Sequence, residues 1–145
     1  MKRPWAQVVC LAGFMAAAGC ARGPEFAEVE GTLSQGGKPL KNVRVEYWPE
    51  TDGPKSSGVT DDQGRYTLKS EDGRTSGAVV GPHKVVLKDL DAYGDSFLGR
   101  KAENMPTINK AAKERFARGY SDAGTTELKK SVSGGQKNVI DLEVK

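Results

Sequence analysis

A turn between two strand-like runs lies at residues 59–68, which read VTDDQGRYTL. Asp61 can accept backbone N–H groups across the turn, and Gly64 can adopt the positive φ that a type I turn with a bulge requires. Tyr66 and Leu68 are two residues apart, so both would face one side of a strand. This stretch predicts a β-hairpin whose turn is shaped by Asp61 and Asp62, with calcium binding by these carboxylates as the alternative.

The neighbouring stretches alternate in the same way. Within residues 43–48, Val43, Val45 and Tyr47 alternate with charged residues and Trp48, which is the period of two expected of a half-buried strand. We expect one further pair of strands in 77–90 and another around the turn at 133–136. Strands are expected over residues 26–33, 43–48, 59–60, 65–68, 77–81, 83–90, 127–132 and 138–144.

The composition fits one small all-β domain. The chain has 145 residues, of which 37% are apolar and 28% charged. Its 18 glycines lie mostly between short apolar stretches, as expected where many tight turns join short strands. About seven strands at this spacing favour two packed sheets. The sequence therefore predicts an all-β sandwich over residues 25–145.

A long connection at residues 91–119 interrupts this pattern and needs structure of its own or a function. Part of it is expected to be helical, because Ile108, Ala112 and Phe116 would share one stripe and Gly119 is a suitable stop. The opposite face of that helix would carry Lys110, Lys113, Glu114 and Arg118.

This connection is the candidate interaction loop. Tyr93 and Phe97 could stack on sugar rings, although loop aromatics also anchor their own loop. Lys110, Lys113 and Arg118 could contact anionic lipid or another envelope protein, although a solvated face explains them too. Trp48 also suggests a carbohydrate platform, whereas Tyr47 and Tyr66 are expected in the core.

The first nineteen residues predict a secretory signal peptide. Lys2 and Arg3 precede the apolar run Val8–Ala18, which is shorter than the roughly 20 residues that cross a bilayer as a helix. Small residues then lead to Cys20, whose thiol can take a diacylglycerol before cleavage. We therefore expect residues 1–19 to be removed, Cys20 to be lipidated, and residues 20–24 to form a flexible linker.

Two alternatives to lipidation remain open: a signal peptide cut at Ala16-Ala17-Ala18, and an uncleaved apolar anchor. The cysteine usage agrees with lipidation, since Cys10 would be removed and Cys20 modified, which leaves a domain free of thiols in an oxidising envelope.

Cleavage would also remove Lys2 and Arg3, so the formal charge would fall from +3 to +1. Because the sequence shows no basic stripe interleaved with aromatics, nucleic acid is not an expected partner.

No catalytic motif stands out. His83 is the single histidine, which excludes a centre with two or three histidine ligands, and no Cys-x-x-Cys or Gly-x-Ser-x-Gly spacing occurs. We expect His83 to be a partly exposed strand residue without a catalytic role. No metal or other cofactor is expected.

Three motifs in order resemble those of carboxypeptidase regulatory-like domains. Residues 31–43, with Gly31-Thr32-Leu33 and Gly37-Lys38-Pro39-Leu40, resemble the opening of that family. Residues 60–66 resemble its Thr-Asp-x-x-Gly-x-Tyr hairpin, and residues 81–85 are similar to its later Pro-Gly strand, with the Pro-Gly order inverted. The tail is similar to that of small planctomycete-type lipoproteins, through Ile108, Arg115-Phe116, residues 125–128 and a terminal hairpin at 132–142.

The resemblance implies a transthyretin-like Greek-key β-sandwich without carboxypeptidase activity. We expect a non-enzymatic lipoprotein of the bacterial cell envelope, a structural module or one that binds protein or polysaccharide. A ligand-binding accessory domain or an unrecognised hydrolase is the alternative. By resemblance to enterobacterial lipoproteins, the absence of Asp after Cys20 favours the outer membrane.

Overall fold

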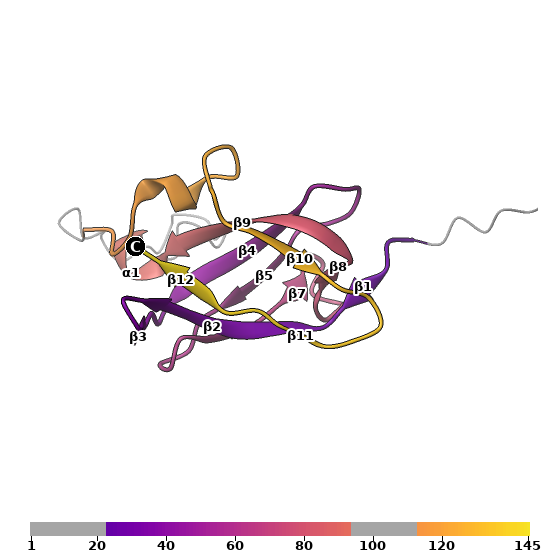
Figure 1. The fold of residues 1–145 in the computed structure, drawn as a ribbon, viewed down its shortest axis with the longest axis horizontal. Coiled ribbons are helices and arrows are strands. Elements are labelled where there is room, and N and C mark those ends of the chain that lie inside the picture. Colours follow the sequence, from indigo (N-terminus) through magenta and orange to yellow (C-terminus); the bar gives the residue numbers. More distant parts are fainter. Residues whose placement is uncertain (1–22, 94–112) are drawn as a thin grey trace, which may run out of the picture.

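The computed structural model describes residues 23–93 and 113–145, which form a mostly β domain (Figure 1). Within the described residues the helical segments are α1 (Leu90–Tyr93) and the 3₁₀ helix η3 (Arg118–Ser121). The strands are β1 (Phe26–Ala27), β2 (Val29–Gln35), β3 (Lys38–Pro39), β4 (Val43–Pro49), β5 (Ser56–Val59), β6 (Arg65–Thr67), β7 (Lys69–Ser70), β8 (Ala78–Val79), β9 (Gly81–Asp89), β10 (Lys129–Val132), β11 (Asn138–Val139) and β12 (Leu142–Val144).

One five-stranded sheet, called here the β4 sheet, is antiparallel with the order β10-β9-β4-β5-β7. Its centre is the pairing of β4 with β9, which runs from Val43 opposite Asp89 to Pro49 opposite His83. The predicted alternation of β4 is confirmed, because its valines and Tyr47 are fully buried whereas Trp48 is 38% exposed.

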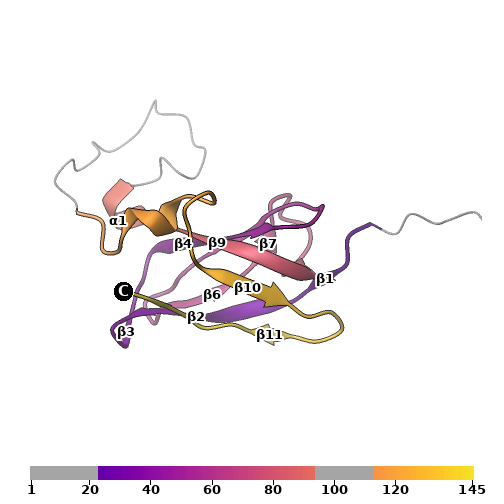
Figure 2. The ribbon, with the colours of Figure 1, turned by 45° about the horizontal axis from the view of Figure 1, so that its top comes forward.

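The second five-stranded sheet, called here the β2 sheet, is built around β2. The strands β11 and β12 run parallel to β2 along one edge, and β3 and β6 run antiparallel to it along the other. Figure 2 shows β4 and β9 in one layer and β2, β6 and β11 in another. A separate two-stranded pair joins β1 to β8.

The core lies where the inner sides of these two sheets meet. Alternate residues of a strand point to opposite faces, so each strand contributes every second residue. The tyrosines at the centre are tied by their hydroxyls, since Tyr66 donates to the Ile140 carbonyl at 2.6 Å and lies 3.0 Å from the Tyr47 hydroxyl. The buried apolar cluster includes Val29, Leu33, Val43, Val45, Tyr47, Tyr66, Leu68, Val85, Leu87, Val132, Leu142 and Val144.

The predicted turn at residues 61–64 is present, but the predicted hairpin is wrong. Asp61 Oδ1 accepts the backbone N–H groups of Gln63 and Arg65, and Gly64 has φ +72°. The flanking strands nevertheless belong to different sheets, because β5 pairs with β4 and β7 while β6 pairs with β2. The turn therefore carries the chain from one layer to the other, which lets Tyr66 enter the core from the β2 sheet.

The other two expected pairs are corrected in the same way. β8 pairs with β1 and not with β9, and β10 pairs with β9 while β11 and β12 pair with β2. Turn-forming residues fix a local reversal, whereas pairing follows from which sheet can bury the flanking apolar residues. Several of the strands in 23–93 and 113–145 span only two residues, which explains why fewer were expected.

The helix expected near residues 107–118 is not found where the chain is described. Residues 113–117 are irregular and η3 begins at Arg118, although Phe116 is buried as its stripe position predicted. Ile108 and Ala112 lie outside the described residues, as do the expected signal segment 1–19, Cys20, Phe97 and Lys110. None of the helical segments within 23–93 and 113–145 is long and apolar enough for a membrane crossing.

Candidate functional site

The outer side of the β4 sheet is basic. Residues paired across an antiparallel sheet share a face, so Lys129, Lys84 and Trp48 form a row across β10, β9 and β4. Lys88 and Arg44 form a second basic row on the same side, beyond the intervening row of Val86 and Glu46. The charged residues at the outward strand positions are Arg44, Lys69, Lys84, Lys88 and Lys129, with Glu46 as the acid among these described positions. We call this side the basic face.

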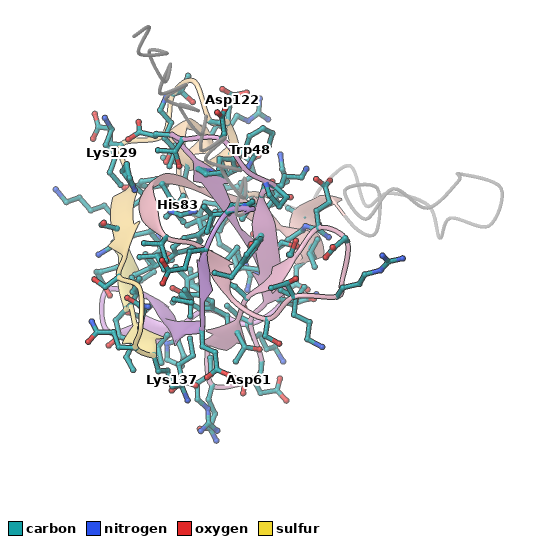
Figure 3. The ribbon with its side chains drawn as sticks, turned by 90° about the vertical axis from the view of Figure 1, so that its right-hand side faces the viewer. Trp48, Asp61, His83, Asp122, Lys129 and Lys137 are labelled. Carbon is teal, nitrogen blue, oxygen red and sulfur yellow. The ribbon has the colours of Figure 1, made fainter. Side chains whose placement is uncertain are left out.

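The outer side of the β2 sheet is acidic. It carries Glu30, Asp141 and Glu143, with Arg65 and Lys137, the ion-pair partner of Glu30, as the cations beside them. Figure 3 shows Trp48 and Lys129 at one side of the molecule and Asp61 and Lys137 at the opposite side. The near-neutral charge expected of the mature chain therefore conceals two faces of opposite sign.

Trp48 lines a depression of about 370 Å³ at one end of the basic face. The other lining residues are Pro49, Gly53, Pro54, Lys55 and Glu71. The Lys55 ammonium lies 4.9 Å from the centre of the indole ring and 3.3 Å from a Glu71 carboxylate oxygen. An aromatic side chain in a concave, charged surface is the arrangement by which proteins commonly bind small polar ligands.

A buried carboxylate fixes the orientation of the indole. Glu46 is only 4% exposed, although it belongs to the outer side of β4. Its two oxygens accept from Trp48 Nε1 at 3.1 Å and from Arg44 Nε at 2.9 Å. Arg44 also donates to the Ser57 hydroxyl at 3.1 Å. These bonds hold both side chains against the sheet, so the exposed part of Trp48 has a defined direction.

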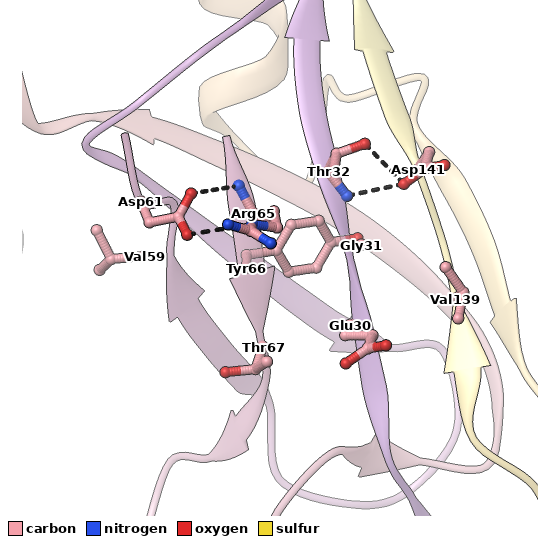
Figure 4. A pocket seen from close by; sticks show the side chains of 10 residues that line it. All are labelled: Glu30, Gly31, Thr32, Val59, Asp61, Arg65, Tyr66, Thr67, Val139 and Asp141. Carbon is pink, nitrogen blue, oxygen red and sulfur yellow. Dashed lines mark hydrogen bonds and ion pairs between the residues drawn. The ribbon is translucent and has the colours of Figure 1, made fainter. Parts of the chain in front are cut away.

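A larger depression of about 580 Å³ lies on the acidic face (Figure 4). Its carboxylates are already used in the fold. Asp141 accepts from the backbone N–H and hydroxyl of Thr32 at 2.8 and 2.7 Å, and these bonds hold the pKa of Asp141 below its usual value. Backbone N–H groups of Arg65 and Gln63 likewise lower the pKa of Asp61.

The contacts of Asp141 join the tail of the chain to β2. The contacts of Asp61 join the start of β6 to the turn. No group of three or more His, Cys, Asp or Glu side chains in the described part of the chain is placed to hold a metal ion.

Arg115 closes the base of the long connection. Its guanidinium donates to both oxygens of Asp89, at 2.9 and 2.5 Å, and its backbone N–H donates to Asp89 at 3.1 Å. Asp91 lies 3.3 Å from the same guanidinium. Because Asp89 ends β9 and Arg115 lies beyond residue 112, this bidentate pair fixes both ends of the connection together. The sequence motif contained Arg115, but its partner was not predicted.

The expectation that His83 is partly exposed is wrong, because its side chain points inward from β9 and is 1% exposed. Its Nδ1 lies 3.0 Å from the Gly81 carbonyl, so Nδ1 carries the proton. Nε2 is buried and has no hydrogen-bond partner within the described residues. The ring packs 5.6 Å from that of Tyr47. Its inward position follows from the alternation of β9, in which residues 83, 85 and 87 share the core side.

Burial of His83 predicts a loss of stability in mild acid. Desolvation lowers its pKa below 6.5, against the opposing effects of the Gly81 carbonyl and the Glu50 charge. The unfolded chain therefore binds more protons below about pH 6.5, and stability should fall by up to about 1.4 kcal/mol per pH unit there.

Urea unfolding of the wild type and of His83→Leu from about pH 7.5 to about pH 5.5, roughly one unit on either side of the ordinary histidine pKa, would isolate this effect. The slope should be smaller in the variant, because the chain has no other histidine. Equal slopes in the two proteins would contradict the assignment.

The predicted interaction residues are only partly placed. Tyr93 ends α1, and Lys113 and Arg118 are exposed, with Arg118 Nε donating to Glu114 at 3.0 Å. Because Phe97 and Lys110 lie outside the described residues, this surface stays a prediction. The sequence suggested Trp48 as part of a carbohydrate platform. The row of lysines beside it could not be predicted, because it depends on pairing between strands that are distant in the sequence.

Comparisons of the chain with protein family models, with curated proteins and with solved structures found no match.

Proposed function

We propose that this protein is a lipid-anchored, non-enzymatic binding module of the bacterial cell envelope. The observation that carries the proposal is the depression around Trp48, in which a fixed aromatic ring lies beside the Lys55 ammonium. A binding function needs only such a preformed, accessible surface. The anchor would be Cys20, and residues 21–24 would separate the domain from the membrane, which we place at the outer membrane.

We propose further that the two sheets form a transthyretin-like Greek-key sandwich. In support, one apolar cluster contains residues of both five-stranded sheets. The three motifs that resemble carboxypeptidase regulatory-like domains fall on β2 with β3, on the turn before β6, and on β9. In such a fold the module would support or position other components without carrying chemistry of its own.

The alternative, a hydrolase using His83, has less support. A general base must reach a substrate proton within hydrogen-bond distance or through one water. His83 is 1% exposed and its proton is engaged with the Gly81 carbonyl. Substrate access would require β9 and β4 to separate, which would disrupt the central pairing of the β4 sheet.

Membrane fractionation and intact-mass measurement in a bacterial host test the anchor. Wild type is expected in the membrane fraction with residues 1–19 removed and a lipid adduct on Cys20. Cys20→Ser is expected to lose the adduct and the processing that depends on it. The matched control is Cys10→Ser, which alters the other cysteine and should leave the mature protein unchanged. A wild-type protein cleaved near Ala18 with an unmodified N-terminus would overturn the lipoprotein assignment.

A further inference from the structure

We infer that the Trp48 depression binds an acidic polysaccharide, with a sugar ring stacked on the indole and a sugar carboxylate paired with Lys55 and Lys84. The inference rests on the proposed binding function and names its ligand class. It follows from three observations: an aromatic ring presented in the depression, a lysine without an ion-pair partner among the described residues on the adjoining strand, and walls fixed by the fold.

The aromatic ring is presented in a way that a core residue is not. Trp48 is 38% exposed, whereas Tyr47 beside it in the sequence is fully buried. Its polar edge is already used, because Nε1 donates to the buried Glu46 carboxylate. What remains accessible is apolar ring surface, which suits the C–H face of a sugar.

The charge next to this ring selects an anionic ligand. Lys84 lies directly opposite Trp48 in the pairing of β4 with β9, and neighbouring strands are about 4.8 Å apart. Within the described chain Lys84 has no ion-pair partner, whereas Lys129 in the same row lies 3.8 Å from Glu50. Lys84 does not line the depression itself, but on the strand beside Trp48 it is a cation available to a ligand carboxylate that extends beyond the depression.

Lys55 supplies the second cation by exchanging partners. In the free protein its ammonium lies over the ring at 4.9 Å and pairs with Glu71 at 3.3 Å. Glu71 is half exposed in this pair, so its hold on Lys55 is weak. A bound sugar would take the place over the indole, and its carboxylate would replace that of Glu71.

Apart from the Lys55 side chain, the walls of the depression are fixed before any ligand arrives. Gly53 has φ +147°, and a Cβ at that position would lie 2.8 Å from Val79 Cγ2, so the loop packs closely on β8. The Glu50 N–H donates to the Pro82 carbonyl and the Glu71 N–H to the Lys55 carbonyl, at 2.9 and 3.0 Å. A site whose geometry is set in advance loses less conformational entropy on binding.

An acidic sugar polymer fits these properties better than other occupants do. A neutral sugar would use the ring but leave Lys84 without a partner. A flat anionic membrane would meet the lysines but would not fill a concave site. A ligand that carries both a ring face and a carboxylate uses the indole of the depression and also Lys84 on the adjoining strand.

The test is binding of polygalacturonate to the full protein, purified in detergent from the host membrane. Trp48 reports directly on the site, because the other tryptophan is Trp5 in the expected signal segment. Polygalacturonate should change the Trp48 emission and co-sediment with the protein, and added salt should weaken binding. Neutral pullulan, poly-L-glutamate and vesicles of phosphatidylglycerol should each bind more weakly.

Variants assign the contacts. Lys84→Glu should weaken binding by about tenfold or more, while the matched control Lys38→Glu, which makes the same charge change on β3, should leave it unchanged. Trp48→Ala should abolish co-sedimentation, and Glu71→Gln should strengthen binding because Lys55 is released. Equal binding of poly-L-glutamate or pullulan, preference for the vesicles, or an unchanged affinity in Lys84→Glu would each overturn the inference.

The inference and the proposed function can fail separately. If the wild-type protein carries lipid on Cys20 but does not bind polygalacturonate, only the proposed ligand class is rejected. Polygalacturonate binding by a protein without lipid would reject only the anchor.

Discussion

Replacing Arg115 with alanine is expected to lower the free energy of unfolding by about 3 kcal/mol, because it leaves the carboxylate of Asp89 buried without its partner. The Asp89 side chain is 1% exposed and accepts from the guanidinium and the backbone N–H of Arg115. Truncation removes both guanidinium bonds and keeps only backbone donors. Urea unfolding at pH 7, followed by circular dichroism, would measure the loss.

The same variant should change the response to acid. Burial acts to raise the pKa of Asp89, but the hydrogen bonds and charge of Arg115 outweigh it and hold that pKa below its usual value. In the wild type this contribution is therefore present above about pH 4 and is lost as the pH falls through the folded-state pKa. In Arg115→Ala burial dominates and the carboxyl protonates more readily. The stability difference between the two proteins should narrow in acid.

Arg118→Ala is the matched control. Arg118 also pairs with a carboxylate, that of Glu114, but its side chain is 85% exposed. Exposed pairs of this kind contribute about 0–1 kcal/mol, so the unfolding midpoint should hardly move. If Arg115→Ala is as mild as Arg118→Ala, the Asp89 pair does not close the base of the connection as described.

Local signals in the sequence were read correctly more often than long-range ones. The alternation of residues 43–48 gave the buried and exposed sides of β4, and Asp61 with Gly64 gave the turn. Both depend on neighbours a few residues away. The partners of β5 and β6 do not, because a turn specifies a reversal of the chain but not which sheet receives each arm.

The candidate site shows the same division. The alternation of residues 43–48 placed Trp48 on the side of the strand opposite Val43, Val45 and Tyr47. Its neighbour Lys84 is 36 positions later in the sequence and lies beside it only through the pairing of β4 with β9. The basic face could not be recognised from charge counts, since the acidic face balances it. The expectation for His83 was wrong for a related reason. Histidine side chains are often partly exposed, but the alternation of β9 places His83 on the same core side as Val85 and Leu87.

Replacing Gly31 with alanine is expected to destabilise the domain by about 3 kcal/mol or more, since it forces two backbones apart. A Cβ at Gly31 would lie 1.8 Å from the Ile140 carbonyl oxygen and 2.6 Å from its carbon. That carbonyl accepts from the Tyr66 hydroxyl, and the Ile140 N–H donates to the backbone carbonyl of Glu30 at 2.7 Å. Relief of the clash would therefore break the bonds that join the tail to β2, which explains why a glycine is needed at this position of the first motif.

Gly119→Ala is the matched control for Gly31→Ala, because the Cβ it would add has no described atom within 4 Å outside its chain neighbours and its own helical turn. Its unfolding midpoint should stay within about 0.5 kcal/mol of wild type. Amide exchange gives a second readout if Gly31→Ala still folds: protection should fall first at Ile140 and Leu142, where the tail leaves β2, and not at β4. A Gly31→Ala protein with wild-type stability and a protected tail would contradict the close approach of these backbones.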